Sequence, residues 1–147
     1  MIYLCDLDNT LADISHRLHY IQERPQDWDA FYDACRYDVP IDSVIEVVRA
    51  LHKAEHVILI ITGRSDVVRK ETHDWLANNR VPYDRLVMRR DKDHREDYLV
   101  KEDILDNLIE RGMPMKDVGG VFEDRGQVVD MYRKRGIRVF QVDEGKF

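Results

Sequence analysis

Short apolar runs alternate along the chain with longer segments in which apolar residues recur every three or four positions. The apolar runs predict five strands, at residues 2–7, 57–62, 85–88, 118–123 and 137–142. Most of these runs are continuously apolar and do not alternate with polar residues. This pattern is typical of strands that are buried on both faces of a parallel sheet.

Four segments between these runs predict helices, at residues 41–51, 68–76, 100–109 and 128–132. Ser65 is suited to cap the second helix. Gly112 and Gly136 follow the last two helices, where glycine commonly ends a helix. Because strands and helices alternate, the predicted fold class is α/β, with a doubly wound, mainly parallel, five-stranded Rossmann-like sheet.

Residues 12–40 interrupt this alternation between the first strand and its helix. An insertion of this length predicts a small helical cap over a binding site in preference to a structureless loop. Trp28, Phe31 and Tyr32 have helical spacing within it. We interpret them as the core of the cap in preference to a base-stacking surface. We expect a single domain over residues 1–147, because no repeat or linker divides the sequence.

The composition, 44% hydrophobic and 35% charged, is that of a globular protein. No apolar run approaches the roughly 20 residues that a transmembrane helix needs, so we expect no contact with a membrane. Two cysteines are too few for a disulfide framework, which favours a cytoplasmic protein. The net charge of −6 argues against a protein that coats nucleic acid, but it allows an enzyme that binds one or two phosphates locally.

Charged and hydroxyl side chains follow the predicted strands at their carboxyl ends or begin the next helix. In open α/β sheets, ligands bind beyond the carboxyl ends of the strands, so these side chains are expected to converge. In chain order they are Asp6 and Asp8, Thr62 and Arg64, Asp97 and Lys101, and Glu123 and Asp124.

This set of residue types indicates phosphoryl transfer with a metal ion. Several carboxylates at one place resist ionising together, and a divalent cation removes that difficulty. Oxygen ligands suit Mg²⁺, which also bridges to phosphate. The Thr62 hydroxyl and the positive charges of Arg64 and Lys101 suit the phosphoryl oxygens. A single Asp-x-Asp or Thr-Gly-Arg is usually a loop or a turn, so the prediction depends on the whole ordered set.

Two other chemistries are disfavoured. A cysteine phosphatase needs Cys-x₅-Arg, but the sixth residue after Cys5 is Leu11 and the sixth after Cys35 is Ile41. Both cysteines are therefore expected in the core. A zinc site is disfavoured because two histidine pairs have helical spacing but lack cysteine or acidic partners in a matching pattern. The pairs are His16 with His19 and His52 with His56.

The segments Asp-Leu-Asp-Asn-Thr-Leu at 6–11 and Ile-Ile-Thr-Gly-Arg at 60–64, together with Lys101 and Glu123-Asp124, resemble the four motifs of the haloacid dehalogenase (HAD) superfamily of phosphatases. This resemblance covers nearly the whole chain. It implies that Asp6 is a nucleophile that forms an aspartyl-phosphate.

The resemblance also assigns roles to the other motif residues. It implies that Asp8 is the general acid and then the general base. Asp124, with Glu123, would hold Mg²⁺ together with Asp6 and the backbone carbonyl of Asp8. Thr62 and Lys101 would stabilise the phosphoryl group. Glu123 departs from the aspartate that is commoner at its position.

A narrower resemblance involves residues 97–104, 121–133 and the tail 141–147. These segments are similar to the 3′-phosphatase domain of phage polynucleotide kinase–phosphatase. By that resemblance Arg17, Arg64 and Asp97 would support substrate binding, with Arg17 reaching the phosphate from the cap. The kinase motif Gly-x-x-x-x-Gly-Lys-Ser/Thr does not occur in these residues, so we expect a stand-alone phosphatase.

The expected function is therefore a Mg²⁺-dependent phosphomonoesterase, acting on the 3′-phosphate end of DNA or RNA in end repair. One alternative is a HAD phosphatase of free nucleotides or another small phosphorylated metabolite, which the acidic net charge favours. Another is a non-catalytic partner that keeps only the fold, which the complete motifs disfavour. The charge-dense residues 89–95 are usual for a solvated loop, but their position would also allow contact with a polynucleotide backbone.

Overall fold

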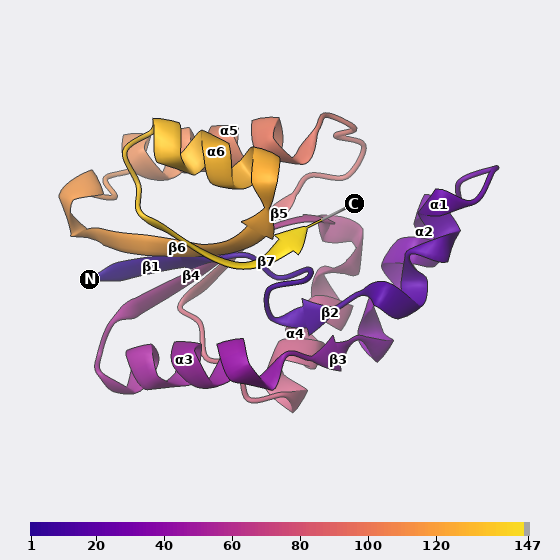
Figure 1. The fold of residues 1–147 in the computed structure, drawn as a ribbon, viewed down its shortest axis with the longest axis horizontal. Coiled ribbons are helices and arrows are strands. Elements are labelled where there is room, and N and C mark those ends of the chain that lie inside the picture. Colours follow the sequence, from indigo (N-terminus) through magenta and orange to yellow (C-terminus); the bar gives the residue numbers. More distant parts are fainter. Residues whose placement is uncertain (146–147) are drawn as a thin grey trace.

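The computed structural model describes residues 1–145 and contains one five-stranded parallel sheet. Its strand order is β5-β4-β1-β6-β7, so β1 lies in the centre (Figure 1). The strands are β1 (Ile2–Cys5), β4 (Val57–Ser65), β5 (Arg85–Arg89), β6 (Val118–Arg125) and β7 (Val139–Gly145). The predicted fold class is confirmed. Lys146 and Phe147, the end of the tail segment that resembles the phage phosphatase, lie outside the described residues.

Helices cover both faces of the sheet (Figure 1). On one face lie α3 (Asp42–Lys53) and α4 (Arg69–Asn78), and on the other lie α5 (Asp97–Glu110) and α6 (Gly126–Lys134). Ser65 accepts a hydrogen bond from Val67 N, but it caps the short 3₁₀ helix η3 (Asp66–Val68) that precedes α4. The last two helices end shortly before Gly112 and Gly136, whose positive φ angles of 106° and 78° turn the chain away.

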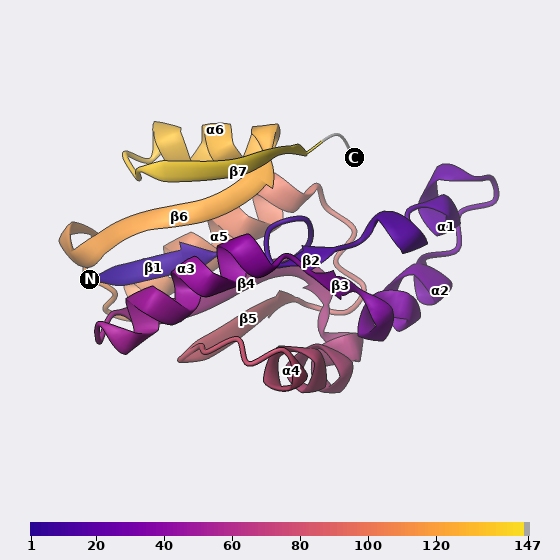
Figure 2. The same cartoon turned by 60° about the horizontal axis from the view of Figure 1, so that its bottom comes forward.

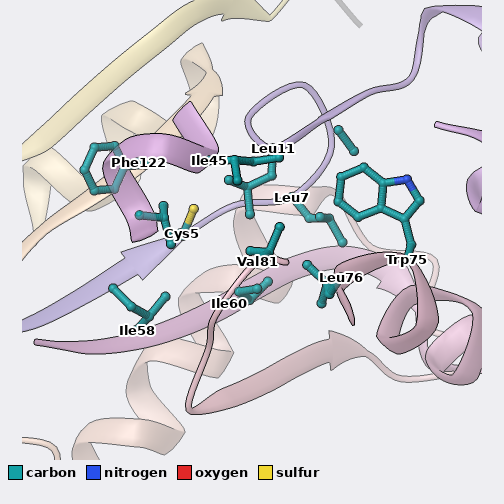
Figure 3. Close-up of a cluster of buried hydrophobic side chains, with 12 residues drawn as sticks. Cys5, Leu7, Leu11, Ile45, Ile58, Ile60, Trp75, Leu76, Val81 and Phe122 are labelled. Carbon is teal, nitrogen blue, oxygen red and sulfur yellow. The ribbon is translucent and has the colours of Figure 1, made fainter. Parts of the chain in front are cut away.

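Strand β4 shows why its sequence is continuously apolar. Ile58 and Ile60 point to the face covered by α3 and α4, where they join a cluster that includes Ile45, Trp75 and Leu76 (Figure 3). Leu59 and Ile61 point to the opposite face and pack with residues of α5 and α6. Burying each such side chain stabilises the fold by about 1.5–3 kcal/mol. Both faces therefore require apolar residues.

The insertion between β1 and α3 forms a small cap beyond the carboxyl ends of the strands (Figures 1 and 2). It is closed at its base by an antiparallel pair in which Asp13 lies opposite Val39. Its elements are β2 (Ala12–Asp13), η1 (Ser15–Arg17), α1 (His19–Gln22), α2 (Trp28–Asp33), η2 (Ala34–Tyr37) and β3 (Val39–Pro40). The helical cap is thus observed where the sequence predicted it.

The interpretation of the cap aromatics as core residues is only partly right. Phe31 is buried and Tyr32 is half-buried, but 46% of Trp28 is exposed. The physical reason is that Trp28 begins α2, where its ring contacts Phe31 and Tyr32 on one side only. Cys5 and Cys35 are buried, as expected. Over residues 1–145 no helix combines the length and the apolar character needed to cross a membrane.

Candidate active site

Polar side chains from distant parts of the chain meet beyond the carboxyl ends of β1, β4 and β6. Asp6 directly follows β1, and its backbone N–H donates to the carbonyl of Phe122 at 2.9 Å, which fixes it against β6. Asp97 begins α5. The structure brings five of the predicted site residues and two of their chain neighbours to one cavity of about 120 Å³. The site residues are Asp6, Asp8, Asp97, Glu123 and Asp124, and the neighbours are Gly63 and Arg125.

Three buried carboxylates form the centre of this cavity. Asp6, Glu123 and Asp124 each offer an oxygen within 4.8 Å of the others. Over residues 1–145, neither carboxylate oxygen of Asp124 has a hydrogen-bond partner, although both are buried. Burial, with the nearby Glu123, raises the pKa of Asp124 to about 7. Unpartnered buried oxygens at this spacing fit a divalent cation, which would replace the missing partners.

Both carboxylate oxygens of Asp6 accept hydrogen bonds. Its Oδ1 accepts a hydrogen bond from Lys101 Nζ at 2.8 Å, and its Oδ2 accepts one from Thr10 Oγ1 at 3.0 Å. Burial and the neighbouring Glu123 raise the pKa of Asp6, while Lys101 opposes this effect. Thr10 belongs to the first motif, but no separate role for it was predicted. Its hydroxyl fixes the orientation of the predicted nucleophile.

The ammonium group of Lys101 contacts three carboxylates. Its Nζ lies 2.8 Å from Asp6, 2.9 Å from Glu123 and 3.2 Å from Asp97, which precedes it by one helical turn. Burial alone would lower the pKa of Lys101, but these three carboxylates raise it well above its usual value. Lys101 is therefore a permanent cation next to the predicted nucleophile.

Glu123 differs from Asp124 in that both of its oxygens have protein partners. Oε2 accepts from Lys101, and Oε1 accepts from the backbone N–H groups of Asp124 and Arg125 at 3.1 and 3.2 Å. The longer side chain of glutamate allows its carboxylate to reach the backbone N–H groups of the next two residues. Asp124 therefore offers free oxygens to a cation more readily than Glu123 does. Direct metal binding by Glu123 stays a prediction.

Asp8 is fixed by two arginines. Its Oδ1 accepts from Arg64 Nε at 2.7 Å and from Arg17 Nη2 at 3.0 Å. Burial alone would raise the pKa of Asp8, but Arg64 and Arg17 outweigh it and lower the pKa below its usual value. Asp8 is therefore ionised in the free protein.

Asp38, which the sequence did not point to, holds the same two arginines from the other side. It is buried at the end of the cap and accepts from Arg17 Nε at 2.8 Å and from Arg64 Nη2 at 2.6 Å. His16 Nε2 lies 2.7 Å from the same carboxylate, and Trp75 Nε1 donates to its backbone carbonyl. Two buried arginines need more negative charge than Asp8 alone supplies, but their burial is not visible in the sequence.

Arg17 and Arg64 are fully buried and do not line the cavity. Beyond Asp8 and Asp38, Arg17 donates to the carbonyl of Phe31, and Arg64 donates to Thr72 Oγ1. These contacts favour a role in positioning Asp8. The predicted contact of either arginine with substrate phosphate stays a prediction.

Thr62 is also fully buried, and its Oγ1 accepts from the backbone N–H of Arg64 at 3.1 Å. This hydrogen bond lies where the register of β4 against β5 shifts, between Thr62 and Ser65. Its predicted contact with the phosphoryl group is not tested by this geometry.

Asp97 packs directly over Gly63. A Cβ atom at Gly63 would overlap the Asp97 carboxylate, with Asp97 Cγ only 3.0 Å away, so a larger residue here would displace that carboxylate. Asp97 also lies within 3.6 Å of Arg89 Nη2 and 3.8 Å of Arg125 Nη1. Its Oδ1 is buried and has no hydrogen-bond partner among the described residues. Asp97 thus links the cavity wall to Lys101.

The cap and the end of β5 supply a wall that the site prediction did not include. Its members line the cavity opposite the carboxylates and are Ile21, Trp28, Phe31, Tyr32 and Arg89. The helical spacing of the aromatics was visible in the sequence. Which of them would face the site was not, because that depends on how the cap is placed.

Comparison with known proteins agrees with this geometry. Residues 1–147 match the family model described as the polynucleotide kinase PNKP phosphatase domain. A chain from the Pnkp1/Rnl/Hen1 RNA repair complex is 28% identical, with a TM-score of 0.79 over 99% of this chain and 43% of that chain. A chain from another structure of the Pnkp1/Rnl/Hen1 complex is 29% identical, with a TM-score of 0.80 over 99% and 47%. The present chain thus spans less than half the length of these proteins.

More distant structures share the fold. The class C acid phosphatase from Bacillus anthracis, solved with tungstate bound, has a TM-score of 0.67 and 13% identity over 99% of this chain and 67% of that chain. At this identity the similarity shows the fold alone. From the match over its whole length, the chain belongs to the family of polynucleotide kinase PNKP phosphatase domains and is a HAD-type phosphatase.

Proposed function

We propose that this protein is a Mg²⁺-dependent phosphomonoesterase that removes the 3′-phosphate from a DNA or RNA end through an aspartyl-phosphate on Asp6. The observation that carries the proposal is the setting of Asp6. Lys101 and Thr10 hold its two oxygens, and the unpartnered oxygens of Asp124 lie beside it. Asp6 is thus an oriented carboxylate next to a site that is suited to a cation.

Asp6 is the nucleophile in this mechanism. One of its oxygens forms a bond to phosphorus while the bond from phosphorus to the 3′-oxygen breaks. Lys101 lies where it can balance charge on the phosphoryl oxygens as they approach Asp6. Asp6, Asp124 and Glu123 would hold Mg²⁺, which when bound supplies further positive charge to the phosphoryl group.

Asp8 moves the protons. It is ionised in the free protein, and it gains a proton when the phosphate dianion enters beside it, because a nearby negative charge raises the pKa of a carboxyl group. It gives this proton to the leaving 3′-oxygen. A water molecule then attacks phosphorus and loses a proton to Asp8, so that phosphate is released and Asp6 is regenerated. Arg17 and Arg64 hold Asp8 in place for both steps.

The choice of substrate is supported by the family match and by the relatives that come from an RNA repair complex. A polynucleotide 3′-phosphate is a monoester, which suits the chemistry above. The same chemistry would also act on a free nucleotide, so the substrate has to be tested directly.

The test is phosphate release from a 3′-phosphorylated oligonucleotide and from a panel of nucleoside monophosphates, each with Mg²⁺ and with EDTA. We expect turnover of the oligonucleotide only with Mg²⁺, and its loss in Asp6→Asn. Asp117→Asn, a change at an exposed carboxylate outside the cavity, should behave like the unmodified protein. Full turnover by Asp6→Asn would refute the aspartyl-phosphate. Faster turnover of free nucleotides would assign the enzyme to them instead.

A further inference from the structure

A second cavity of about 290 Å³ adjoins the active-site cavity. Its walls are the start of α2, the residues around η3, and residues 89–95, which comprise the last residue of β5 and the loop after it (loop 89–95). Trp28, Tyr32 and Arg89 line both cavities. The two cavities are therefore neighbouring parts of one groove that leads away from the catalytic carboxylates.

The active-site cavity is too small to hold a whole nucleotide. Its volume of about 120 Å³ lies below the roughly 300–1,000 Å³ of typical small-molecule sites. It accommodates the terminal phosphate and little more. The remainder of a larger substrate has to extend out of it, and the second cavity offers a lined path.

Trp28 is placed for stacking at the junction of the two cavities. The residue is 46% exposed. Phe31 packs edge-on against it at 5.6 Å, and Tyr32 lies at 6.0 Å with a tilt of 35°. These neighbours fix the ring while one part stays open. An exposed, fixed aromatic ring is the common platform for nucleic-acid bases.

The loop 89–95 adds positive charge along the same groove. Arg89 and Arg95 are engaged, the first with the carbonyls of Gly63 and Arg95 and the second with the Asp93 and Asp103 carboxylates. The side chains of Arg90 and Lys92 are exposed, and neither has an ion-pair partner in the part of the chain that the structure describes. These two cations are free to meet phosphodiester groups.

We propose that this groove holds the nucleotides on the 5′ side of the terminal phosphate, with a base stacked on Trp28 and the backbone next to Arg90 and Lys92. The proposal rests on the function proposed above and adds a reason why a polynucleotide is preferred over a free nucleotide. The acidic residues Asp29 and Asp91 on the same walls limit the contact to a short stretch. A binding surface of this kind is compatible with the net charge of −6.

The catalytic test compares kcat/KM for 3′-phosphorylated substrates of one, two, three and six nucleotides. We expect a rise of about tenfold or more between one and three nucleotides, since one stacked base contributes roughly that factor or more. Trp28→Ala should reduce the ratio of kcat/KM for the longest to that for the shortest substrate by about tenfold, and Trp28→Phe should largely restore it. Tyr37→Ala is the matched control, because Tyr37 is an exposed aromatic residue of the cap that lines neither cavity.

The binding test does not depend on turnover. The affinity of Asp6→Asn for a 3′-phosphorylated hexanucleotide should fall as the salt concentration rises. The double variant Arg90→Ala/Lys92→Ala should reduce the slope of log K against log salt by about 1.4, or about 0.7 for each phosphate contact that is lost. Lys53→Ala/Lys116→Ala, which removes two exposed lysines elsewhere, should leave the slope unchanged.

The outcomes separate the two proposals. If oligonucleotides are hydrolysed but kcat/KM depends neither on substrate length nor on Trp28, the groove proposal is wrong and the proposed function stands. If oligonucleotides bind in a manner that depends on Trp28 but are not hydrolysed, the groove is supported and the proposed function is wrong. If they neither bind nor react, both proposals are overturned.

Discussion

Asp38→Asn tests whether the cap positions Asp8, the proposed general acid and base. The change keeps the size of the side chain but removes its charge. At present both Asp38 oxygens accept hydrogen bonds, from Arg17 and His16 on one side and from Arg17 and Arg64 on the other. An amide has only one acceptor oxygen, so its NH₂ group would face an N–H donor of an arginine. Asp8 would then be the one remaining carboxylate that contacts the two arginines.

The size of the effect follows from this burial. Removing one partner of a buried ion pair costs about 3–5 kcal/mol, because the remaining charge has no compensation. For a protein of this length, 1 kcal/mol corresponds to about 2–4 °C in Tm, so a fall of roughly 10 °C is expected. Arg17 and Arg64 also set the position of Asp8. A displacement of about 1 Å at a catalytic group reduces turnover by roughly 100-fold.

The assay is thermal unfolding together with kcat and KM on a 3′-phosphorylated oligonucleotide, well below the lowered Tm. We expect kcat to fall much more than KM changes, because Asp38 is a positioning residue that lies outside the cavity. Asp33→Asn is the matched control, since Asp33 is an exposed cap residue whose ion pair with Arg36 contributes little. A lower Tm with an unchanged kcat would refute the coupling of Asp38 to Asp8 and leave it a purely structural residue.

Three further changes probe the cavity itself. Lys101→Met should lower the rate of turnover by about 100-fold or more in a single-turnover assay, because it removes the cation that contacts the proposed nucleophile Asp6; activity near the original level would exclude this role. Gly63→Ala should displace the Asp97 carboxylate and lower kcat/KM, and a crystal structure with Asp97 unmoved would contradict the overlap. The raised pKa of Asp124, about 7 in the folded protein, stabilises the metal-free fold below pH 4, and this stability is lost as the pH rises through 7. Mg²⁺ should therefore raise Tm more at pH 8 than at pH 5, and an equal rise at both values would argue against Asp124 as its ligand.

The sheet could be predicted from the sequence because its strands are apolar on both faces. The predicted end of β4 at residue 62 was three residues short, since the strand continues to Ser65 with an irregular register against β5. The polar Thr-Gly-Arg-Ser sequence resembles a turn, and only the pairing with β5 makes it part of the strand. Local sequence carries no information about that pairing.

The convergence of the carboxylates could also be predicted, because parallel strands bring their carboxyl ends to one edge. The role of Asp38 could not. The cap contains several acidic residues, and nothing in the local sequence distinguishes the buried Asp38 from the exposed Asp29 or Asp33. The exposure of Trp28 was missed for the same reason, since helical spacing groups aromatic residues without showing which one faces solvent.

The charged residues of the site form two groups, and the charges balance in only one of them. Asp8 and Asp38 face Arg17 and Arg64, so this group contains two negative and two positive charges and is complete without a metal ion.

The second group contains four carboxylates, those of Asp6, Asp97, Glu123 and Asp124, around the single buried cation Lys101. The arginines near Asp97 lie at its rim, at 3.6 and 3.8 Å. A divalent cation would supply the missing charge next to Asp124, the one member whose two oxygens are both unpartnered within residues 1–145. We therefore infer that removing the metal affects the ionisation of Asp6 and Asp124 but leaves Asp8 ionised and in place. The nucleophile would depend on the metal ion, and the acid–base residue would depend on the cap.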